Sequence, residues 1–337
     1  MTSLTTPPLR IAIAGVGEVA RKNYLPFLAS QPDVMLACHN RTPAKAEQAR
    51  REFGAEVCPT LEALAAWRPT AVLVLTAETC RHETGTELIN LGVPRIFFEK
   101  PLVAVRGQAR VEEADFLRGR EMLHFAAARR CETAMVFNYR FFAQSVAARA
   151  AAETRGFGPV IGITAQVHYA CWSHCIDLIH WLAGGIKEIT ALSGPVERIG
   201  DRVGAARDVT AAFITEGGAA GTLVGTAGMA WQHPLFELTF TFARGRIHLR
   251  DLDGTLEILD GTRQQQETIS FGRDTSRWAN YDESFRQAIG AYLQSLRAGT
   301  PPPVPGIEGL RELQVEAALQ RSIRERRPVR LAEEFPL

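Results

Sequence analysis

The sequence predicts an α/β protein in two parts: a doubly wound parallel sheet at the N-terminus, and a C-terminal α+β part with a large, mainly antiparallel open sheet. Three observations lead to this prediction. Strand-like runs alternate with helical segments through residues 1–135, a glycine-rich turn directly follows the first of these runs, and from residue 160 short strand-like runs follow one another across glycine-containing turns. We therefore expect two domains, 1–135 and 136–337.

The first part alternates between the two kinds of element. In a doubly wound sheet the ligand crevice lies beyond the carboxyl ends of the strands, so residues that follow a strand are site candidates. The predicted strands are 10–14, 34–38, 55–58, 71–76, 95–98 and 133–137. The predicted helices are a segment ending near residue 30, then 43–53, 61–67, 82–91 and 106–130.

The second part changes to consecutive strands, predicted at 160–169, 186–192, 209–215, 219–226, 235–242, 245–250 and 255–259. Consecutive short strands with tight turns indicate an antiparallel sheet. One helix, near residues 172–182, interrupts the series. One face of the sheet should pack on helices, and the other face, if apolar, needs a partner.

Composition excludes several classes of function. The chain has 337 residues, of which 46% are hydrophobic and 22% charged, and its net charge of +1 gives no reason to expect nucleic acid or an anionic membrane as partner. No apolar run approaches the roughly 20 residues that span a bilayer, and residues 1–8 lack the features of a signal peptide. We expect a cytoplasmic protein with reduced cysteines.

The glycine-rich turn has the G-x-G-x-x-A form of a dinucleotide-binding fingerprint. Gly15 allows the tight turn, and Gly17 lets the backbone approach a pyrophosphate at the N-terminus of the following helix. A tight turn without a nucleotide is the alternative. The predicted contacts come from Gly15, Val16, Gly17, Glu18 and Val19.

The end of the second strand bears on the choice of cofactor. An Asp or Glu about 20 residues after the glycines would bind the ribose of NAD. The chain instead has Asn40, Arg41, Thr42 and Lys45 in this region. A guanidinium and hydrogen-bond donors suit a 2′-phosphate, so NADP is preferred, with NAD possible. The alternative is a basic turn that caps the next helix.

The fifth strand ends in Glu99-Lys100-Pro101, which places a lysine at the crevice. Only four of the 38 basic residues are lysines, so Lys100 stands out in an arginine-rich chain. A lysine can act as acid and base, whereas arginine stays protonated. Thr76 also follows a strand, so it should converge on the glycine turn. A surface pair between Lys100 and Glu99 is the alternative.

The interrupting helix carries a second cluster. His174 and Asp177 are three residues apart, so they share a face, and the carboxylate could fix the tautomer of the imidazole. A structural His-Asp pair without a ligand is the alternative. The spacing of His168, Cys171 and Cys175 around His174 matches no common zinc pattern, so no metal is predicted.

In their order along the chain, four features resemble the glucose-fructose oxidoreductase, inositol dehydrogenase and rhizopine catabolism (Gfo/Idh/MocA) family. They are the glycine turn, the segment 76–82, Glu99-Lys100-Pro101 and the sequence Asn-Tyr-Arg-Phe at 138–141. The resemblance extends over nearly the whole chain, to the final helices near 281–297 and 309–324. It implies cofactor contacts from Thr76, Ala77, His82, Glu99 and Lys100.

The resemblance also implies that His174 and Asp177 stand at the substrate site, and that the open sheet face forms a homodimer or homotetramer. Two departures affect the chemistry. Ala170 replaces the family's aspartate, and the loop before the helix is shorter. Tyr169 or His168 could substitute for the carboxylate, or Lys100 and His174 could suffice.

Pocket-lining candidates are residues at the ends of elements: Arg140, Tyr169, Trp172, Trp231 and His233. Aromatic side chains with polar groups suit polyhydroxylated rings. The expected function is NAD(P)-dependent hydride transfer to or from a secondary alcohol or ketone of a sugar, cyclitol or related small metabolite. Lys100 would serve as acid and base, and His174 would orient the same oxygen. Two alternatives remain: an imine or keto-intermediate reductase, and a non-catalytic NAD(P)-binding sensor.

Overall fold

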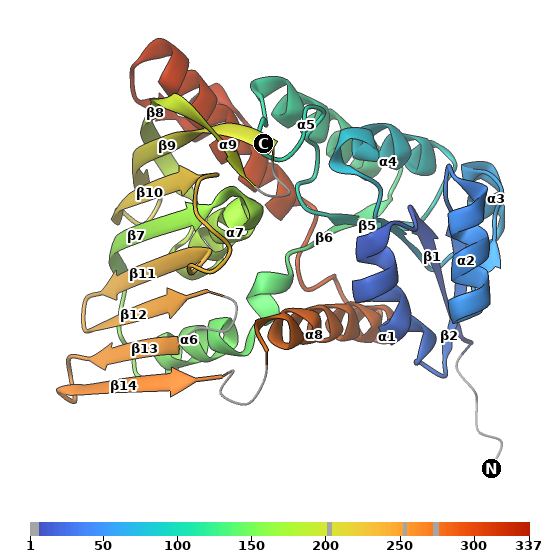
Figure 1. Ribbon diagram of the computed structural model, residues 1–337, viewed down its shortest axis with the longest axis horizontal. Coiled ribbons are helices and arrows are strands. Elements are labelled where there is room, and N and C mark those ends of the chain that lie inside the picture. The colour runs from blue at the N-terminus through green and yellow to red at the C-terminus, as the bar shows by residue number, and fades with distance from the viewer. Residues whose placement is uncertain (1–6, 201–203, 252–254, 272–275) are drawn as a thin grey trace. The chain divides into compact units, whose positions relative to one another are not determined.

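The computed structural model describes residues 7–200, 204–251, 255–271 and 276–337 (Figure 1). The expectation that residues 1–8 lack the features of a signal peptide falls mostly outside this range, because residues 1–6 are not described. The chain divides into two compact units. The first comprises residues 1–103, 118–136 and 285–309, and the second comprises 104–117, 137–284 and 310–337. The contiguous domains 1–135 and 136–337 stay a prediction.

The first unit contains a six-stranded sheet in the order β3-β2-β1-β4-β5-β6, and all of its strand pairs are parallel. This confirms the doubly wound sheet. Its strands are β1 (Leu9–Ala14), β2 (Val34–His39), β3 (Glu56–Val57), β4 (Ala71–Val74), β5 (Arg95–Glu99) and β6 (Glu132–Val136). The helical elements between them are η1 (Ala20–Tyr24), α1 (Leu25–Ala29), α2 (Pro43–Phe53), α3 (Leu61–Ala66), η2 (Glu78–Cys80), α4 (Arg81–Asn90) and α5 (Glu113–Ala128).

Two predicted helices differ from the structure. The helix after the glycine turn begins as the π-helix η1, which buries Tyr24 completely. The helix expected at 106–130 is shorter, because α5 begins only at Glu113. The carboxylate of Asp115 accepts hydrogen bonds from the backbone N–H groups of Val105 (3.1 Å) and Glu112 (2.9 Å), and so holds the preceding residues in turns.

The second unit contains a nine-stranded sheet in the order β14-β13-β12-β11-β7-β10-β9-β8-β15. Only the pair β7 and β10 is parallel among the pairs described, which confirms a mainly antiparallel sheet. The strands are β7 (Val160–His168), β8 (Ile186–Gly200), β9 (Gly204–Thr215), β10 (Ala220–Thr226), β11 (Phe236–Phe242), β12 (Gly245–Arg250), β13 (Thr255–Asp260), β14 (Gln265–Ser270) and β15 (Val329–Arg330).

The hairpin of β8 and β9 is longer than predicted, and strand β14 was not predicted. The register of β8 shifts between Ser193 and Glu197, where Pro195 interrupts the apolar alternation. Strand β14 reads Gln-Gln-Glu-Thr-Ile-Ser, and this polar edge gives almost no hydrophobic pattern. Its identity as a strand comes from its pairing with β13.

Helices α6 (Ala143–Thr154) and α7 (Trp172–Ala183) lie along one face of this sheet (Figure 1). The core there comprises apolar side chains that alternate along the strands, such as Ile163, Ala165 and Val167 of β7. The remaining helical elements of the chain are η3 (Asn138–Phe141), η4 (Tyr169–Cys171), α8 (Arg277–Ala298), α9 (Ile307–Glu325) and α10 (Leu331–Glu334).

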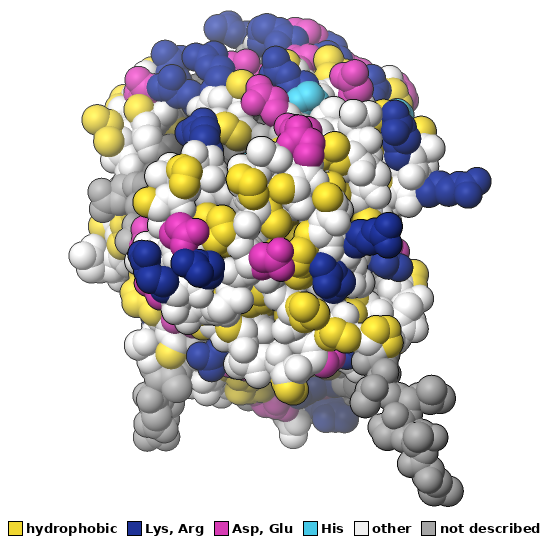
Figure 2. Space-filling view, turned by 90° about the vertical axis from the view of Figure 1, so that its right-hand side faces the viewer, with side chains coloured by type: hydrophobic (Ala, Val, Ile, Leu, Met, Phe, Trp, Pro, Cys, Tyr) yellow, Lys and Arg dark blue, Asp and Glu magenta, His cyan; other side chains and the backbone are white. Residues whose placement is uncertain are grey.

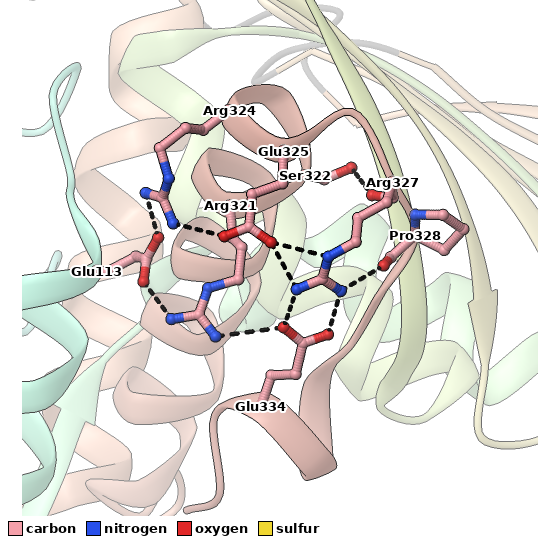
Figure 3. Close-up of polar contacts among 8 residues, drawn as sticks. All are labelled: Glu113, Arg321, Ser322, Arg324, Glu325, Arg327, Pro328 and Glu334. Carbon is pink, nitrogen blue, oxygen red and sulfur yellow. Dashed lines mark hydrogen bonds and ion pairs between the residues drawn. The ribbon is translucent and has the colours of Figure 1, made fainter.

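The end of the chain is held to α9 by ion pairs (Figure 3). Arg327 donates to both carboxylate oxygens of Glu334, at 2.7 Å each, and Arg321 bridges Glu334 and Glu113. The hydrogen bonds from Arg327, and then those from Arg321, lower the pKa of Glu334 to about 2, although partial burial opposes the shift. The network fixes α10 beside the last turns of α9.

Acidic and basic side chains are interspersed on the face shown in Figure 2, with hydrophobic ones between them. This distribution accords with the net charge of +1. Within the described ranges, no helix combines the length and the apolar character needed to cross a membrane.

Candidate functional site

The glycine turn has the geometry that a dinucleotide requires. Gly15 has φ +98°, and a Cβ on it would lie 2.6 Å from the backbone nitrogen of Thr76, so only glycine fits. A Cβ on Gly17 would meet nothing within 4 Å, which leaves open space at the N-terminus of the following helix. The buried Thr76 hydroxyl has no hydrogen-bond partner among the described residues. These features fit a dinucleotide whose phosphates approach Gly17.

Strand β2 ends beside this turn. The side-chain oxygen of Asn40 accepts a hydrogen bond from Val16 N at 2.9 Å, and its amide donates to Thr42 O at 3.1 Å. Asn40 therefore ties the glycine turn to the end of β2. Arg41, Thr42 and Lys45 are exposed, and the Thr42 side chain does not cap α2. Three donor side chains are thus available at the place where the ribose-binding carboxylate is absent.

The turn that presents Lys100 is built on a buried network. The Glu99 carboxylate, 7% exposed, accepts hydrogen bonds from the Tyr24 hydroxyl at 3.0 Å and from Lys100 N at 2.6 Å. Arg81 is also buried and donates to Pro101 O across the cis peptide bond between Lys100 and Pro101. Burial lowers the pKa of Arg81, and the Glu99 charge opposes this shift. Glu99 is therefore an interior anchor, not half of a surface pair.

Arg81 and Tyr24 of this network were not among the site residues predicted from the sequence. Tyr24 carries no motif signal, and the neighbouring His82, which was chosen instead, is half-buried. Ala77, Glu18 and Val19 are exposed around the glycine turn, and Val16 is buried. All the predicted cofactor residues belong to the first unit.

In the second unit, helix α7 presents His174. The imidazole is 2% exposed and stacks on the ring of Tyr139, with centroids 3.9 Å apart and 7° between the planes. Phe137 approaches the same imidazole edge-on at 5.9 Å. The Tyr139 hydroxyl lies 3.2 Å from Cys171 Sγ. Burial, with smaller effects of Cys171 and Tyr281, raises the pKa of Tyr139 well above its usual value, so the phenol stays neutral.

Asp177 pairs with an arginine from another element. Arg140 Nε lies 2.8 Å from Asp177 Oδ2, and Arg140 Nη2 lies 2.6 Å from Oδ1. The carboxylate is fully buried and the guanidinium is 10% exposed. The spacing within α7 suggested that Asp177 supports His174, but it could not indicate this two-contact ion pair with Arg140.

Besides burial, the guanidinium groups of Arg311 and Arg140 affect the pKa of His180, which lies on the next turn of α7. Burial first, and then Arg311 and Arg140, lower the pKa of His180 to about 3, so it is neutral at physiological pH. The Nε2 atom of His180 is buried with no hydrogen-bond partner among the described residues.

The residues that could replace the missing carboxylate are already engaged. His168, with no exposed surface, accepts a hydrogen bond at Nδ1 from Ala170 N at 3.1 Å. The Tyr169 hydroxyl donates to Arg207 O at 2.6 Å. Trp172 is 2% exposed, and a Cβ on Gly225 would lie 2.4 Å from its ring. Tyr169 and Trp172 therefore act mainly as packing residues here, and their predicted contact with substrate stays a prediction.

In the described part of the chain, no group of three or more His, Cys, Asp or Glu side chains is arranged to hold a metal ion. The six cysteines, all within the described ranges, form no disulfide bond with one another.

Comparison with known proteins gives two family matches. Residues 9–128 match the model of the GFO_IDH_MocA oxidoreductase family, described as an NAD-binding Rossmann fold. Residues 164–331 match the model of that family's C-terminal alpha/beta domain.

Individual relatives are more distant. The dTDP-3,4-didehydro-2,6-dideoxy-alpha-D-glucose 3-reductase of Streptomyces antibioticus is 29% identical over 107 residues, which are 32% of this chain and 33% of the relative. The matched segment thus spans about a third of that relative's length.

Solved structures share the fold. An oxidoreductase from Agrobacterium radiobacter in complex with NAD+, L-tartaric acid and magnesium has a TM-score of 0.80 at 16% identity, covering 97% of this chain and 99% of that one. The WlbA dehydrogenase from Bordetella pertussis, in complex with NADH and UDP-GlcNAcA, has a TM-score of 0.74 at 18% identity, covering 96% and 98% of the two chains.

Proposed function

Because the chain belongs to the Gfo/Idh/MocA oxidoreductase family, we propose that it transfers a hydride between NADP and a secondary alcohol or ketone of a sugar, cyclitol or related small metabolite. The observation that carries this proposal is the pair of glycines in the first turn. Gly15 has no room for a side chain beside Thr76, and Gly17 faces open space. The hydroxyl of Thr76 has no hydrogen-bond partner among the described residues.

A bound nicotinamide would supply or accept the hydride, and the protein must move a proton at the reacting oxygen. Lys100 serves as that acid and base in the proposed mechanism. Its backbone N–H donates to the Glu99 carboxylate, which also accepts from the Tyr24 hydroxyl, and Arg81 donates to Pro101 O on the other side of the lysine. This anchoring supports a fixed position for the lysine Cα, which acid-base catalysis requires.

His174 is proposed to orient the same oxygen. Stacking on Tyr139 restricts the rotation of the imidazole, and the buried Arg140–Asp177 pair stiffens the same helix. Tyr169 and His168 are bound to backbone atoms of their own unit, which favours a mechanism in which Lys100 and His174 suffice without the family's aspartate.

A preference for NADP over NAD is also proposed. Arg41, Thr42 and Lys45 are exposed at the end of β2, and Asn40 offers an amide in place of a carboxylate. A 2′-phosphate would gain charge-assisted hydrogen bonds there, and no carboxylate at that position would repel it.

The proposed oligomer is a homodimer or homotetramer formed through the open face of the nine-stranded sheet. This face carries the exposed side chains of Leu192 (69% exposed) and Ile214 (40%), and a depression of ≈ 490 Å³ lies across β7 to β10. Light scattering on the purified protein, with Leu192→Glu as an interface variant, tests the assembly.

The decisive experiment replaces Lys100 with Met. NADPH fluorescence should report unchanged cofactor binding. Turnover is measured as NADPH absorbance, which falls when keto sugars are reduced by NADPH and rises when cyclitols are oxidised by NADP+, and its rate should fall roughly 100- to 10,000-fold. Normal turnover in Lys100→Met would refute the role of the lysine. Imines in the same panel test the reductase alternative, and NADPH binding without turnover of any compound would favour a sensor.

A further inference from the structure

Three aromatic side chains of the second unit contact one another and have no role in the proposed mechanism. Trp231, which precedes β11, lies 6.0 Å from Trp278 of α8 between ring centroids, with 32° between the planes. Tyr281, one turn further along α8, meets Trp278 edge-on at 5.9 Å. We call these three residues the aromatic shelf.

An ion pair between Arg277 and Asp251 helps to fix the position of the aromatic shelf. Arg277 pairs with the buried Asp251 and donates hydrogen bonds to the backbone oxygens of Trp231 and, at 3.2 Å, His233. Asp251 also accepts a hydrogen bond from Leu235 N at 3.0 Å. The segment before β11 and the start of α8 are therefore fixed to each other, which preorganises the shelf.

Exposure distinguishes the shelf from ordinary core packing. Trp278 is 40% exposed, although a tryptophan gains more from burial than almost any other side chain. Asp282 lies one turn of α8 after Trp278 and so shares its face of the helix. In the part of the chain that the structure describes, the buried Oδ1 of Asp282 has no hydrogen-bond partner. An apolar ring surface beside an unused acceptor is the usual chemistry of a carbohydrate subsite.

The shelf is adjacent to the candidate catalytic cluster but distinct from it. Trp231 lies 5.6 Å from the ring of His168, and Tyr281 is near enough to Tyr139 to contribute to the rise of its pKa, after burial and Cys171. Tyr139 in turn stacks on His174. The shelf is therefore connected to the candidate catalytic imidazole through ring contacts of the second unit.

We infer that the aromatic shelf binds a second ring joined to the sugar or cyclitol that undergoes hydride transfer, so that the preferred substrate is a glycoside rather than a free monosaccharide. The inference rests on the proposed function for the position of the reacting ring. The shelf has two centroid steps of about 6 Å, enough surface for a pyranose, an aryl group or a nucleobase.

Binding is measured by calorimetry on the full-length Lys100→Met variant with NADPH present, so that turnover does not interfere. The probes are phenyl β-D-glucopyranoside, cellobiose and UDP-glucose, with methyl β-D-glucopyranoside as the ligand that lacks a second ring. At least one ring-bearing probe should bind roughly 10-fold more tightly than the methyl glycoside. Its identity distinguishes an aryl, a sugar and a nucleotide as the second ring.

Variants of the shelf then locate the effect. Trp278→Ala should reduce the preference to less than about 2-fold, while Trp278→Phe, which keeps an aromatic face, should retain most of it. Trp67→Phe, in the first unit, is the matched control and should leave the preference unchanged. Equal affinity for all probes, no binding of any ring-bearing probe, or a preference that survives Trp278→Ala overturns the inference. Turnover of a keto sugar by Lys100→Met would refute the proposed role of the lysine instead. The glycoside probes carry no ketone that NADPH could reduce, so their affinities would still be measurable.

Discussion

The rings of Tyr139 and His174 lie face to face, 3.9 Å apart and within 7° of parallel. This stack links the Asn-Tyr-Arg-Phe segment to the helix that carries the candidate catalytic imidazole. It also assigns a role to Tyr139 that needs no contact with substrate. The residue positions His174.

Replacing Tyr139 with Leu should therefore lower kcat roughly 10- to 100-fold, because an imidazole that can rotate no longer holds the reacting oxygen. Tyr139→Phe keeps the stack and should lose much less. NADPH turnover measures both variants, and circular dichroism checks that each is folded. Equal activities of the Leu and Phe variants would argue against positioning by the stack.

The Arg140–Asp177 pair predicts a large effect on stability. Asp177→Asn leaves a mostly buried guanidinium without its counter-charge and should lower the free energy of unfolding by about 3 kcal/mol. The double variant Arg140→Met with Asp177→Leu should cost less than the sum of the single changes. Urea titration of the natural protein, the single variants Arg140→Met and Asp177→Leu, and the double variant gives the coupling energy. Strict additivity would mean that the pair contributes little.

Substitutions of the two glycines of the first turn should both weaken cofactor binding but differ in their effect on stability. Gly15→Ala places a Cβ against Thr76 N at a φ of +98°, and it should lower the melting temperature as well as cofactor affinity. Gly17→Ala meets no protein atom, so it should fold normally and bind NADPH at least about 10-fold more weakly, because the methyl group fills space meant for a phosphate. Thermal unfolding and NADPH fluorescence separate the two effects. Unchanged affinity in Gly17→Ala would place the phosphates elsewhere.

Cofactor discrimination should depend on Arg41. Arg41→Ala removes one charge-assisted contact to a 2′-phosphate and should weaken NADPH binding roughly 10- to 100-fold while changing NADH binding little. Arg51→Ala, an exposed arginine at the other end of α2, is the control. Parallel losses for both cofactors in Arg41→Ala would contradict a preference for NADP.

The Glu334 network should make stability depend on pH. The folded pKa of Glu334 is about 2, against an ordinary value of 4.5, so its stabilising effect is complete above 4.5 and is lost as the pH falls toward 2. Glu334→Gln should lower the free energy of unfolding by about 1 kcal/mol at neutral pH. The difference from the natural protein should shrink across this acidic range in urea titrations. A difference that is independent of pH would show that packing, rather than charge, accounts for it.

Local patterns identified the elements of the fold whose signal lies within one segment. Strand β1 with its glycine turn could be read directly, because the fingerprint residues are consecutive. The same holds for β5, where apolar residues run directly into Lys100. Strand β14 and the far end of the β8–β9 hairpin could not be read, because polar edge residues and Pro195 remove the alternation on which such a prediction depends.

The candidate site was predictable as single residues but not as a network. His174 was identified from its helix, whereas its stacking partner lies 35 positions earlier in the chain. The bond from Tyr24 to Glu99 joins residues 75 positions apart, and Arg140 lies 37 positions from Asp177. Such contacts depend on the tertiary fold. Sequence spacing suggested instead that Asp177 would assist its neighbour on the helix.

The two edges of the nine-stranded sheet limit how it can aggregate. One edge is β15, only two residues long, and the other is β14, in which Gln265, Gln266 and Glu267 occupy half of the strand. A short strand and a polar strand are poor templates for further backbone pairing, so lateral growth into fibrillar assemblies is disfavoured. Truncating β14 would therefore expose the apolar strand β13 as a new edge and increase precipitation during refolding.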